Sequence, residues 1–436
     1  MTSDWVLGTL GEVCRSVFSG GTPTSTNPDY YGGSIPWLRT KEVNYTKIYE
    51  TEVCISQAGF DASSAKLVPI NSVIVAMYGN GDTAGRVAIN KVPLTTNQAC
   101  CNLVIDGSKA DYRFVYYYLK ARYQKLVDLK NGGAQQNLNG RLIKDFPIAV
   151  PALATQVEIG DFLEALDDRI ALLRETNATL EAIAQALFKS WFVDFDPVRA
   201  KQQGLAPAGM NEATAALFPD SFEESALGWV PKGWGVGSIL DVATLLSGGT
   251  PKTDRPEFWG GGIRWASAKD VSQSTGSVLV STERTITQEG LARSATRLIP
   301  ALATAVVARG ATTGRMVLLG AEMAMNQTCY ALTSKHNAPV ALYCLLRKEI
   351  DALVNAAHGS VFDTITTKTF DRSTVIHPRL DLLDRFEQIA RPIVDKIVEA
   401  TSMAQTLATL RDTLLPRLIS GQLRLPEAGA LIVEAT

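Results

Sequence analysis

Ser19-Gly20-Gly21-Thr22-Pro23 returns about 228 residues later as Ser247-Gly248-Gly249-Thr250-Pro251. At nearly the same offset, Asn97-Gln98 returns as Asn326-Gln327. Solenoid repeats have periods of about 20–50 residues, so a period this long indicates a duplicated domain. We therefore expect two similar sites on one polypeptide.

The net charge of −2 is unevenly distributed along the chain. Residues 1–150 carry 15 Lys and Arg against 12 Asp and Glu, and residues 229–378 carry 15 against 11. Residues 151–228, by contrast, carry 5 against 13, and residues 379–436 carry 7 against 8. Positive charge therefore lies on the two repeats, which favours a polyanionic partner there.

The remaining composition narrows the function classes. The six cysteines have no metal-ligand spacing, which favours free thiols in a reducing compartment over a zinc site. All three histidines (His336, His358 and His377) lie in the second half, so a catalytic histidine shared by both repeats is excluded. The N-terminus lacks a signal-peptide pattern and no apolar run reaches about 18 residues, which predicts a cytoplasmic protein without a membrane span.

Each repeat begins with the pattern of a mixed α+β domain. Short apolar runs bounded by Pro and Gly, such as Ser72–Ala76 and Ala305–Ala308, predict buried strands. Arg113–Leu119 and Val340–Leu346 are predicted to be helical.

A long helical pattern follows each repeat. Apolar residues alternate spacings of four and three, which is typical of a coiled-coil seam. The second seam is apolar except at Arg411, and Pro392 weakens its early part because proline removes a backbone hydrogen bond. Two seams in one chain most simply pair with each other, in an antiparallel arrangement. The seam positions are Ile159, Leu163, Leu166, Ile170, Leu173, Asn177, Leu180, Ala184, Leu187 and Trp191, and then Phe386, Ala390, Ile393, Ile397, Ala400, Ala404, Leu407, Arg411, Leu414 and Leu418.

These patterns predict an α+β chain with an internal pseudo-twofold repeat. A helix of about 40 residues spans about 60 Å. Antiparallel pairing would separate two β-rich domains by a rigid rod, so that they contact DNA one to two helical turns apart. The expected segments are a first domain at 1–151, a spacer helix at 152–196, a linker at 197–228, a second domain at 229–378, a second spacer helix at 379–424 and a C-terminal tail at 425–436.

The chain resembles the specificity subunit of a Type I restriction–modification enzyme. The resemblance rests on Gly20–Pro23, Gly248–Pro251, Leu180–Phe195 and Leu414–Gly421 and covers nearly the whole length. It implies two target recognition domains that read a bipartite site in double-stranded DNA. It also implies helices that hold adenine methyltransferase subunits, and a separate restriction and translocase subunit. The family has no catalytic site of its own, so S-adenosylmethionine, ATP and Mg²⁺ are expected only on partner subunits.

Catalytic motifs in the sequence are weak. Asn27-Pro28-Asp29-Tyr30 is similar to a motif that grips a flipped adenine, but its third residue departs from that motif and a turn is favoured. Two alternatives stay open. One is the recognition subunit of a methyltransferase-only or fused restriction system, and the other is a coiled-coil interaction scaffold that does not bind DNA.

Residues shared by both repeats are candidates for scaffold or phosphate contacts, because two different half-sites cannot be told apart by identical groups. A tight turn is the alternative for the glycines, and exposed unpaired charge is the alternative for the cations. Asn97-Gln98 and Asn326-Gln327 are expected to be structural amides. The shared candidates are Gly20, Gly21, Thr22, Lys41 and Arg86, with Gly248, Gly249, Thr250, Lys269 and Arg315.

Loops that differ between the repeats are candidates for base contacts. Arg309 suits guanine O6 and N7, and Asn80 suits adenine. The first choice is the pair of loops 78–83 and 309–313, with Tyr78, Asn80, Arg309, Thr312 and Thr313. The second choice is Asn44–Tyr49 with Ser272–Ser277, and the third is Gln135–Asn137 with Ser360–Thr364.

Overall fold

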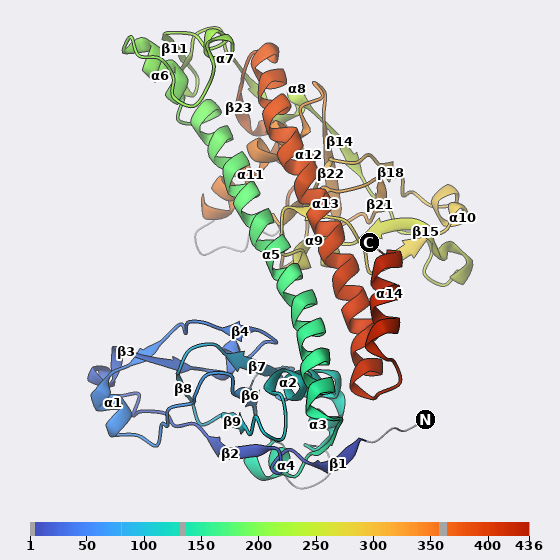
Figure 1. Cartoon of the computed structure of the whole chain (residues 1–436). Coiled ribbons are helices and arrows are strands. Elements are labelled where there is room, and N and C mark those ends of the chain that lie inside the picture. Colours follow the sequence, from blue (N-terminus) through green and yellow to red (C-terminus); the bar gives the residue numbers. More distant parts are fainter. Residues whose placement is uncertain (1–4, 80, 131–136, 357–363, 436) are drawn as a thin grey trace. The chain divides into compact units, whose positions relative to one another are not determined.

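The computed structural model describes residues 5–79, 81–130, 137–356 and 364–435 (Figure 1). The chain divides into two compact units: unit 1 is Met1–Ile170 with Gln405–Thr436, and unit 2 is Ala171–Ala404. Each unit contains one of the sequence repeats and a length of each of the two long helices.

Unit 1 is built on a five-stranded sheet in the order β2-β9-β6-β7-β4, in which only the β4–β7 pair is parallel. A smaller sheet has the order β5-β3-β8, and β1 pairs with β10. The strands are β1 (Val6–Thr9), β2 (Cys14–Ser19), β3 (Tyr31–Leu38), β4 (Lys47–Ile48), β5 (Cys54–Ile55), β6 (Val73–Ala76), β7 (Val87–Asn90), β8 (Thr95–Thr96), β9 (Cys100–Ile105) and β10 (Pro147–Val150).

Unit 2 repeats this topology strand for strand. Its five-stranded sheet has the order β14-β22-β19-β20-β16, its smaller sheet β17-β15-β21-β18 gains one strand, and β13 pairs with β23. The strands are β13 (Gly235–Ser238), β14 (Ala243–Ser247), β15 (Trp259–Ala266), β16 (Val278–Leu279), β17 (Arg284–Ile286), β18 (Leu298–Ile299), β19 (Thr304–Val307), β20 (Met316–Leu319), β21 (Met323–Met325), β22 (Cys329–Ser334) and β23 (Thr374–His377).

Short helices connect the strands, and one larger helix packs on each five-stranded sheet. In unit 1 they are η1 (Pro28–Tyr30), η2 (Thr40–Glu42), α1 (Gln57–Asp61), α2 (Tyr112–Ala121), α3 (Tyr123–Asp128) and α4 (Gly140–Lys144). In unit 2 they are α8 (Ile239–Val242), η3 (Pro256–Phe258), α9 (Ala268–Gln273), α10 (Gln288–Ala292), α11 (Pro339–Ala356) and α12 (Thr367–Arg372).

The predicted strands and helices of the two domains are confirmed. All four residues of β6 and all four of β19 are buried, as expected for central strands of apolar composition. Helix α2 begins at Asp111, whose carboxylate accepts hydrogen bonds from Arg113 N and Phe114 N and so caps the helix. Helices α2 and α11 cover the predicted helical segments.

The two seams form single long helices, α5 (Leu153–Phe192) and α13 (Leu380–Ile419). Helix α13 continues through Pro392, so the expected weakening does not end it. In unit 1, Ile159 of the first turns of α5 shares a core cluster with Leu418 near the end of α13. In unit 2, Trp191 at the end of α5 contacts Phe386 near the start of α13, with ring centroids 6.0 Å apart. The helices are therefore antiparallel in each unit, as predicted.

The predicted pairing residues are buried or partly buried. Leu166, Ile170, Leu173, Trp191, Ile397, Leu407 and Leu414 are at most 9% exposed, and Leu180, Leu187 and Ile393 pack partly buried against the core of unit 2. Polar contacts at the seam define the register. Arg411 donates to Asp167 at 2.5 Å in unit 1, and Asn177 donates to Thr401 at 3.0 Å in unit 2. In both pairs the residue numbers add up to 578, so each unit uses the same antiparallel register.

Two expected segments differ from the structure. The segment 197–228 is a folded part of unit 2, with α6 (Asp196–Gln202), α7 (Glu212–Ala216) and a hairpin of β11 (Phe222–Ser225) and β12 (Gly228–Pro231). Its Val198 and Phe218 are buried in the same cluster as Phe195 and Trp234. The expected C-terminal tail forms α14 (Leu425–Ala435), with Ala428 fully buried in unit 1. Both segments contain too few apolar positions to give a periodic pattern. The sequence therefore did not show that they are buried against a neighbouring surface.

Candidate nucleic-acid interface

The glycine turns of both repeats are sites of close backbone packing. A Cβ atom on Gly20 would lie 2.1 Å from the Thr96 carbonyl oxygen, and one on Gly248 would lie 2.2 Å from that of Asn326. A Cβ on Gly21 would lie 2.2 Å from Ala65 N. Glycine is required here because no side chain fits, whatever the backbone angles.

The amides of Gly20, Gly21 and Gly249 already donate hydrogen bonds within the chain, which favours the tight-turn alternative over donation to phosphate at these positions. Gly21 N donates to Thr96 O at 2.9 Å, and Gly249 N donates to Met325 O at 2.8 Å. Gly20 N likewise donates to Cys100 O at 3.2 Å. The carbonyls of Gly21 and Gly249 accept hydrogen bonds from the indole nitrogens of Trp37 and Trp265, at 2.9 and 3.0 Å. The turn is thus a structural joint in both repeats.

Polar side chains remain at the surface of the turns. Thr22 is exposed, and the Thr250 hydroxyl donates to the side-chain oxygen of Gln327. Asn326 accepts from Thr328 N and from the Thr328 hydroxyl, at 3.3 and 2.8 Å, as expected for a structural amide. Contact of Thr22 and Thr250 with phosphate stays a prediction.

The shared lysines each have a carboxylate partner. Lys41 pairs with Glu52, and Lys269 pairs with Glu283 at 2.6 Å. The hydrogen bond that Lys269 donates to Glu283 raises the pKa of Lys269. These matched lysines are therefore not the unpaired charges that the alternative assumed, and part of their charge is neutralised within the repeat.

The matched arginines Arg86 and Arg315 differ in their surroundings. The Arg86 guanidinium donates to Asp82 at 2.6 Å and to Asn44 at 2.7 Å, and the bond to Asp82 raises its pKa. Arg315 is exposed and forms no ion pair with any residue of the described ranges. The same residue type is thus neutralised in the first repeat and left charged in the second.

Backbone hydrogen bonds bring the loop candidates of each repeat together. We call residues 78–86 and 309–315, which include the segments that the sequence predicts to contact bases, the first and second reading loops; the contact with bases stays a prediction. Leu138 N donates to Met77 O at 3.2 Å, and at the matched position Ile365 N donates to Ala308 O at 2.8 Å. The third-choice segments therefore end beside the reading loops. Asn80, Gln135, Gln136 and 360–363 lie outside the described residues.

The reading loops expose different side chains. Arg309 and Thr312 are exposed at the turn of the second loop, whereas Thr313 is partly buried and its hydroxyl donates to Gly310 O at 2.7 Å. In the first loop Tyr78 is partly buried against the core of unit 1. The exposed, unpaired cations of the second loop can donate to base edges or phosphates.

Comparison with known proteins identifies the duplicated unit. A family model for the Type I restriction modification DNA specificity domain matches residues 2–182 and 231–391. The chain belongs to this family. We call the globular parts of the matched regions, residues 2–151 and 231–378, the first and second specificity domains, and DNA sequence recognition is their function.

One curated relative matches this chain nearly end to end, and a second matches about two thirds of it. The chain is 25% identical over 447 residues to the Type I restriction enzyme MjaIX specificity subunit of Methanocaldococcus jannaschii, covering 97% of this chain and 94% of that protein. It is 26% identical over 344 residues to the HindI specificity subunit of Haemophilus influenzae, covering 69% of this chain and 74% of that protein. The S subunit of a Type-I restriction-modification system from M. genitalium has the same fold, with a TM-score of 0.60, 15% identity and coverage of 95% and 96%.

The second-choice segments of both specificity domains contact the long helix α5. Lys47 pairs with Glu164 at 2.8 Å and with Asp168 at 2.5 Å. Ser277 donates to Glu181 from its backbone nitrogen at 2.8 Å and from its hydroxyl at 2.6 Å. These ends of the segments 44–49 and 272–277 therefore anchor each domain to the helix in its own unit, a role that the sequence did not predict.

An ion-pair network joins the first specificity domain to α5. Arg113 pairs with Glu164 at 3.2 Å and also with Asp161, and Lys120 lies 3.4 Å from Asp167. Burial lowers the pKa of Lys120. The acidic composition of residues 151–228 thus serves partly to bind cations of the domain. The excess of negative charge was the sequence signal for this network.

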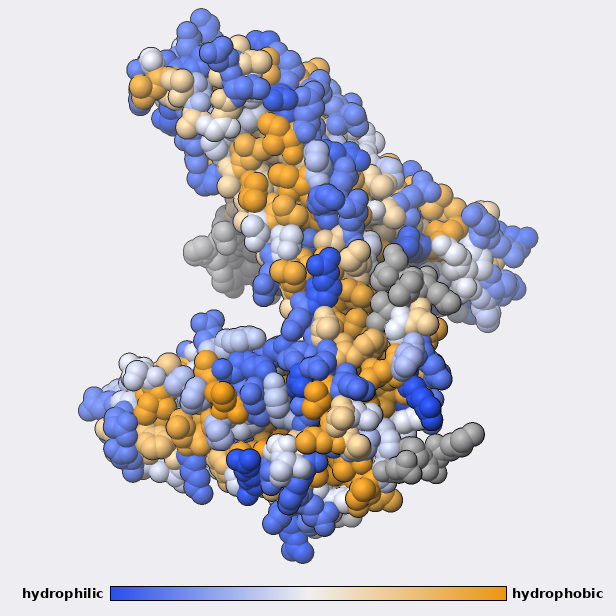
Figure 2. Space-filling view, in the orientation of Figure 1, coloured by the Kyte–Doolittle hydropathy of each residue, from blue (hydrophilic) through white to orange (hydrophobic). Residues whose placement is uncertain are grey.

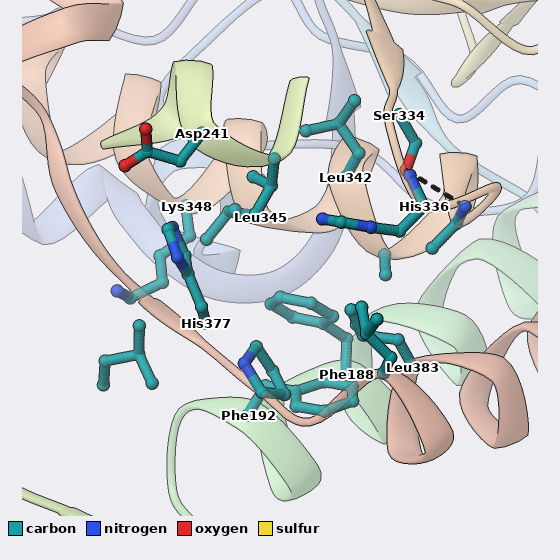
Figure 3. A pocket seen from close by; sticks show the side chains of 16 residues that line it. Phe188, Phe192, Asp241, Ser334, His336, Leu342, Leu345, Lys348, His377 and Leu383 are labelled. Atoms are coloured by element: carbon teal, nitrogen blue, oxygen red, sulfur yellow. Dashed lines mark hydrogen bonds between the residues drawn. The ribbon is translucent and has the colours of Figure 1, made fainter. Parts of the chain in front are cut away.

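Unit 2 also contains an apolar cavity of about 170 Å³ (Figure 3). Its lining includes Phe188 and Phe192 of α5, Leu345 of α11 and Leu383 of α13. His377 lies at its edge with Nε2 3.1 Å from the Ser238 carbonyl oxygen, so this ring supports the β13–β23 end. In the described part of the chain, no group of three or more His, Cys, Asp or Glu side chains is arranged to hold a metal, and no helix is long and apolar enough to cross a membrane.

Proposed function

We propose that the chain is the non-catalytic DNA-reading subunit of a Type I restriction–modification complex. Each specificity domain would read one half of a bipartite site in double-stranded DNA. The proposal rests on one observation: the chain contains two copies of one domain with the same fold, which share the packed glycine turns and differ in their loops.

The contrast between joints and loops supports independent half-sites. The Trp37–Gly21 and Trp265–Gly249 hydrogen bonds agree to within about 0.1 Å, so the scaffolds are equivalent. The reading loops differ in length and charge, with Arg86 neutralised and Arg315 unpaired. Identical scaffolds with different loops suit two half-sites of different sequence.

The long helices would set the gap between the half-sites. Forty residues of α-helix rise about 60 Å, close to two turns of B-DNA. Because α5 and α13 keep one antiparallel register in both units, the length of the helix pair would be fixed. Half-site identity and half-site spacing would then be independent properties.

The helices also offer surfaces for partner subunits. Figure 2 shows apolar surface over the unit 2 stretches of α5 and α13. Leu172 and Ile183 of α5 and Met403 of α13 are 51%, 50% and 41% exposed. Adenine methyltransferase subunits would dock on such surfaces, and a restriction and translocase subunit would complete the complex. S-adenosylmethionine, ATP and Mg²⁺ would belong to those partners, and the complex would act in the cytoplasm.

Reconstitution tests this division of labour. We expect the purified chain to neither methylate nor cleave DNA with S-adenosylmethionine, ATP and Mg²⁺ present. Adding the cognate methyltransferase subunit should produce adenine methylation at one two-part motif. Robust activity of the chain free of other subunits would contradict the proposal, as would methylation by the partner that does not depend on this chain.

A further inference from the structure

A third duplicated segment lies beside the glycine turns. Lys66-Leu67-Val68-Pro69 of unit 1 corresponds to Arg297-Leu298-Ile299-Pro300 of unit 2. A Cβ on Gly21 would lie 2.2 Å from Ala65 N, and one on Gly249 would lie 2.4 Å from Thr296 N. Each cation therefore follows directly on the residue against which the turn packs, at the same place in both domains.

These two cations keep their charge. Both are exposed, and neither has a carboxylate within 4.0 Å among the residues that the structure describes. The Lys66 ammonium lies 5.7 Å above the Phe18 ring, a contact that orients the cation without neutralising it. The other shared lysines, Lys41 and Lys269, by contrast pair with Glu52 and Glu283.

Polar groups at matched positions follow the residues that pack at each glycine turn. Thr22 and Gln98 are exposed and directly follow Gly21 and Asn97, and a Cβ on Gly20 would lie 2.3 Å from Asn97 O. In unit 2, Gln327 is exposed, directly follows Asn326 and accepts from Thr250. We call Lys66 with Thr22 and Gln98 the first cation site, and Arg297 with Thr250 and Gln327 the second, where the cation is the Lys or Arg side chain itself.

Each cation site adjoins a reading loop. Met77, the residue before the first reading loop, donates from its backbone nitrogen to Ala99 O at 2.8 Å, and Ala99 directly follows Gln98. At the matched position Ala308 N donates to Thr328 O at 2.8 Å, directly after Gln327. A duplex that contacts the loop of either domain therefore lies close to the cation site of that domain.

We propose that Lys66 and Arg297 each bind a backbone phosphate of the DNA, flanking the bases contacted by the adjacent reading loop. This inference rests on the proposed function and adds the part of the contact that is blind to sequence. Two different half-sites have only the phosphate backbone in common, so a group that both domains share suits phosphate and not bases. Lysine and arginine both supply the charge that such a contact needs.

The leucines that follow the two cations are also exposed, Leu67 by 56% and Leu298 by 38%. Single exposed leucines are common on protein surfaces, so they do not by themselves select a partner. A protein partner is the competing occupant. The unpaired cations, the hydroxyl and amide groups and the adjoining reading loops favour DNA, and the experiment separates the two.

The test uses the full-length chain and labelled duplexes with and without the two-part motif. The variants are Lys66→Gln, Arg297→Gln and their combination. The control combines Arg15→Gln and Lys335→Gln, which remove one exposed cation from each unit, near the start of β2 and directly after β22, where Arg15 pairs with Asp106 and Lys335 donates to Leu240 O. Affinity is measured as a function of KCl concentration, and binding of the methyltransferase subunit is measured separately.

Each phosphate contact contributes about 0.9 to the slope of log affinity against log salt concentration. We expect each single variant to make that slope shallower by about 1 and the double variant by about 2, equally on both duplexes. Lys66→Arg should keep the slope of the unmodified chain, and the control should keep it too.

Three results would overturn the inference. They are an unchanged salt slope in the double variant, a loss confined to the duplex that carries the motif, and a loss of methyltransferase binding with DNA affinity intact. Failure of the unmodified chain to bind the motif, alone or with the methyltransferase subunit, would instead contradict the proposed function, so the two failures are distinguishable.

Discussion

At the scale of single residues, Gly249 and Gly260 illustrate two different reasons for glycine. Gly249 has no room for a side chain, since a Cβ would lie 2.4 Å from Thr296 N and 2.5 Å from Ala295 C. Gly260 has a φ of 79° with nothing within 4 Å of its Cβ position. One glycine is required by packing and the other by backbone conformation.

These reasons predict different costs. Gly249→Ala should lower the free energy of unfolding by about 3 kcal/mol, because backbone atoms must move apart. Gly260→Ala should cost about 1–2 kcal/mol, the price of a left-handed conformation. Urea denaturation followed by tryptophan fluorescence measures both, and equal costs would contradict the packing argument.

Glu387 predicts a pH dependence of stability. Its carboxylate is 8% exposed and accepts from Ala341 N at 2.8 Å at the start of α11. Burial raises its pKa to about 7 from 4.5. The folded state therefore binds a proton more tightly than the unfolded state, and this group's contribution to stability is full below about pH 4.5 and is lost as the pH rises through 7.

Glu387→Gln should remove that loss, because glutamine keeps an accepting oxygen and carries no charge. The thermal midpoint should rise relative to the unmodified chain at about pH 8 and stay close to it at about pH 4.5, where the folded carboxyl is protonated and the unfolded one is about half protonated. Glu399→Gln, at a carboxylate 71% exposed, is the matched control and should show no such pattern. A midpoint difference that is the same at both pH values would refute the assignment.

At the scale of elements, the long helices are held by polar contacts as well as by their apolar seam. Asp167 accepts from Arg411 of α13 at 2.5 Å and from Tyr117 of α2 at 2.9 Å. Both Asp167 and Arg411 are mostly buried, with side chains 21% and 16% exposed. The pair thus joins α5, α13 and the first specificity domain within unit 1.

Breaking this pair should be costly. Arg411→Met should destabilise the chain by about 2–4 kcal/mol, because Asp167 keeps a buried charge. Arg391→Met removes an exposed partner of Asp395 and should cost under about 1 kcal/mol. A double-mutant cycle with Asp167→Asn should give a coupling energy of about 1–3 kcal/mol. Additive effects of the two substitutions would show that the contact contributes no coupling energy.

Periodicity predicted the elements better than it predicted their partners. The alternation of four and three located α5 and α13, because burial along one face leaves a regular pattern. The hairpin with Phe222 and the helix with Ala428 were missed, since short segments bury residues against surfaces that are distant in sequence. Pairing of Lys41 with Glu52 was also missed, because it depends on how neighbouring strands align.

Charge counting located the cationic repeats but could not show which charges stay free. Lys47, Arg113 and Lys120 of the first domain are bound by carboxylates of α5, whereas Arg309 and Arg315 of the second have no ion pair in the described part of the chain. The duplicated turns could be found from the sequence alone. Their role as closely packed turns could be recognised only from the backbone distances in the structure.

At the scale of the whole molecule, spacing and identity should be separable. Inserting Thr-Leu-Glu-Ala after Ala182 of α5, with a matched insertion of four residues after Asp395 at the opposite register position of α13, lengthens both helices by about 6 Å. The half-sites should stay unchanged, and the gap should grow by about one or two base pairs, since each pair rises about 3.4 Å. Methylation mapping reads both properties, and a changed half-site would contradict the assignment.

The most direct test of two independent half-sites is the adenine methylation map of cells that express the methyltransferase subunit with either the unmodified chain or one whose residues 309–313 are replaced. Single-molecule sequencing gives the motif for each. We predict a two-part motif for the unmodified chain, and for the variant one altered or relaxed half, the other half intact and the same gap. A single uninterrupted motif, a change in both halves or a change in the gap would contradict the account.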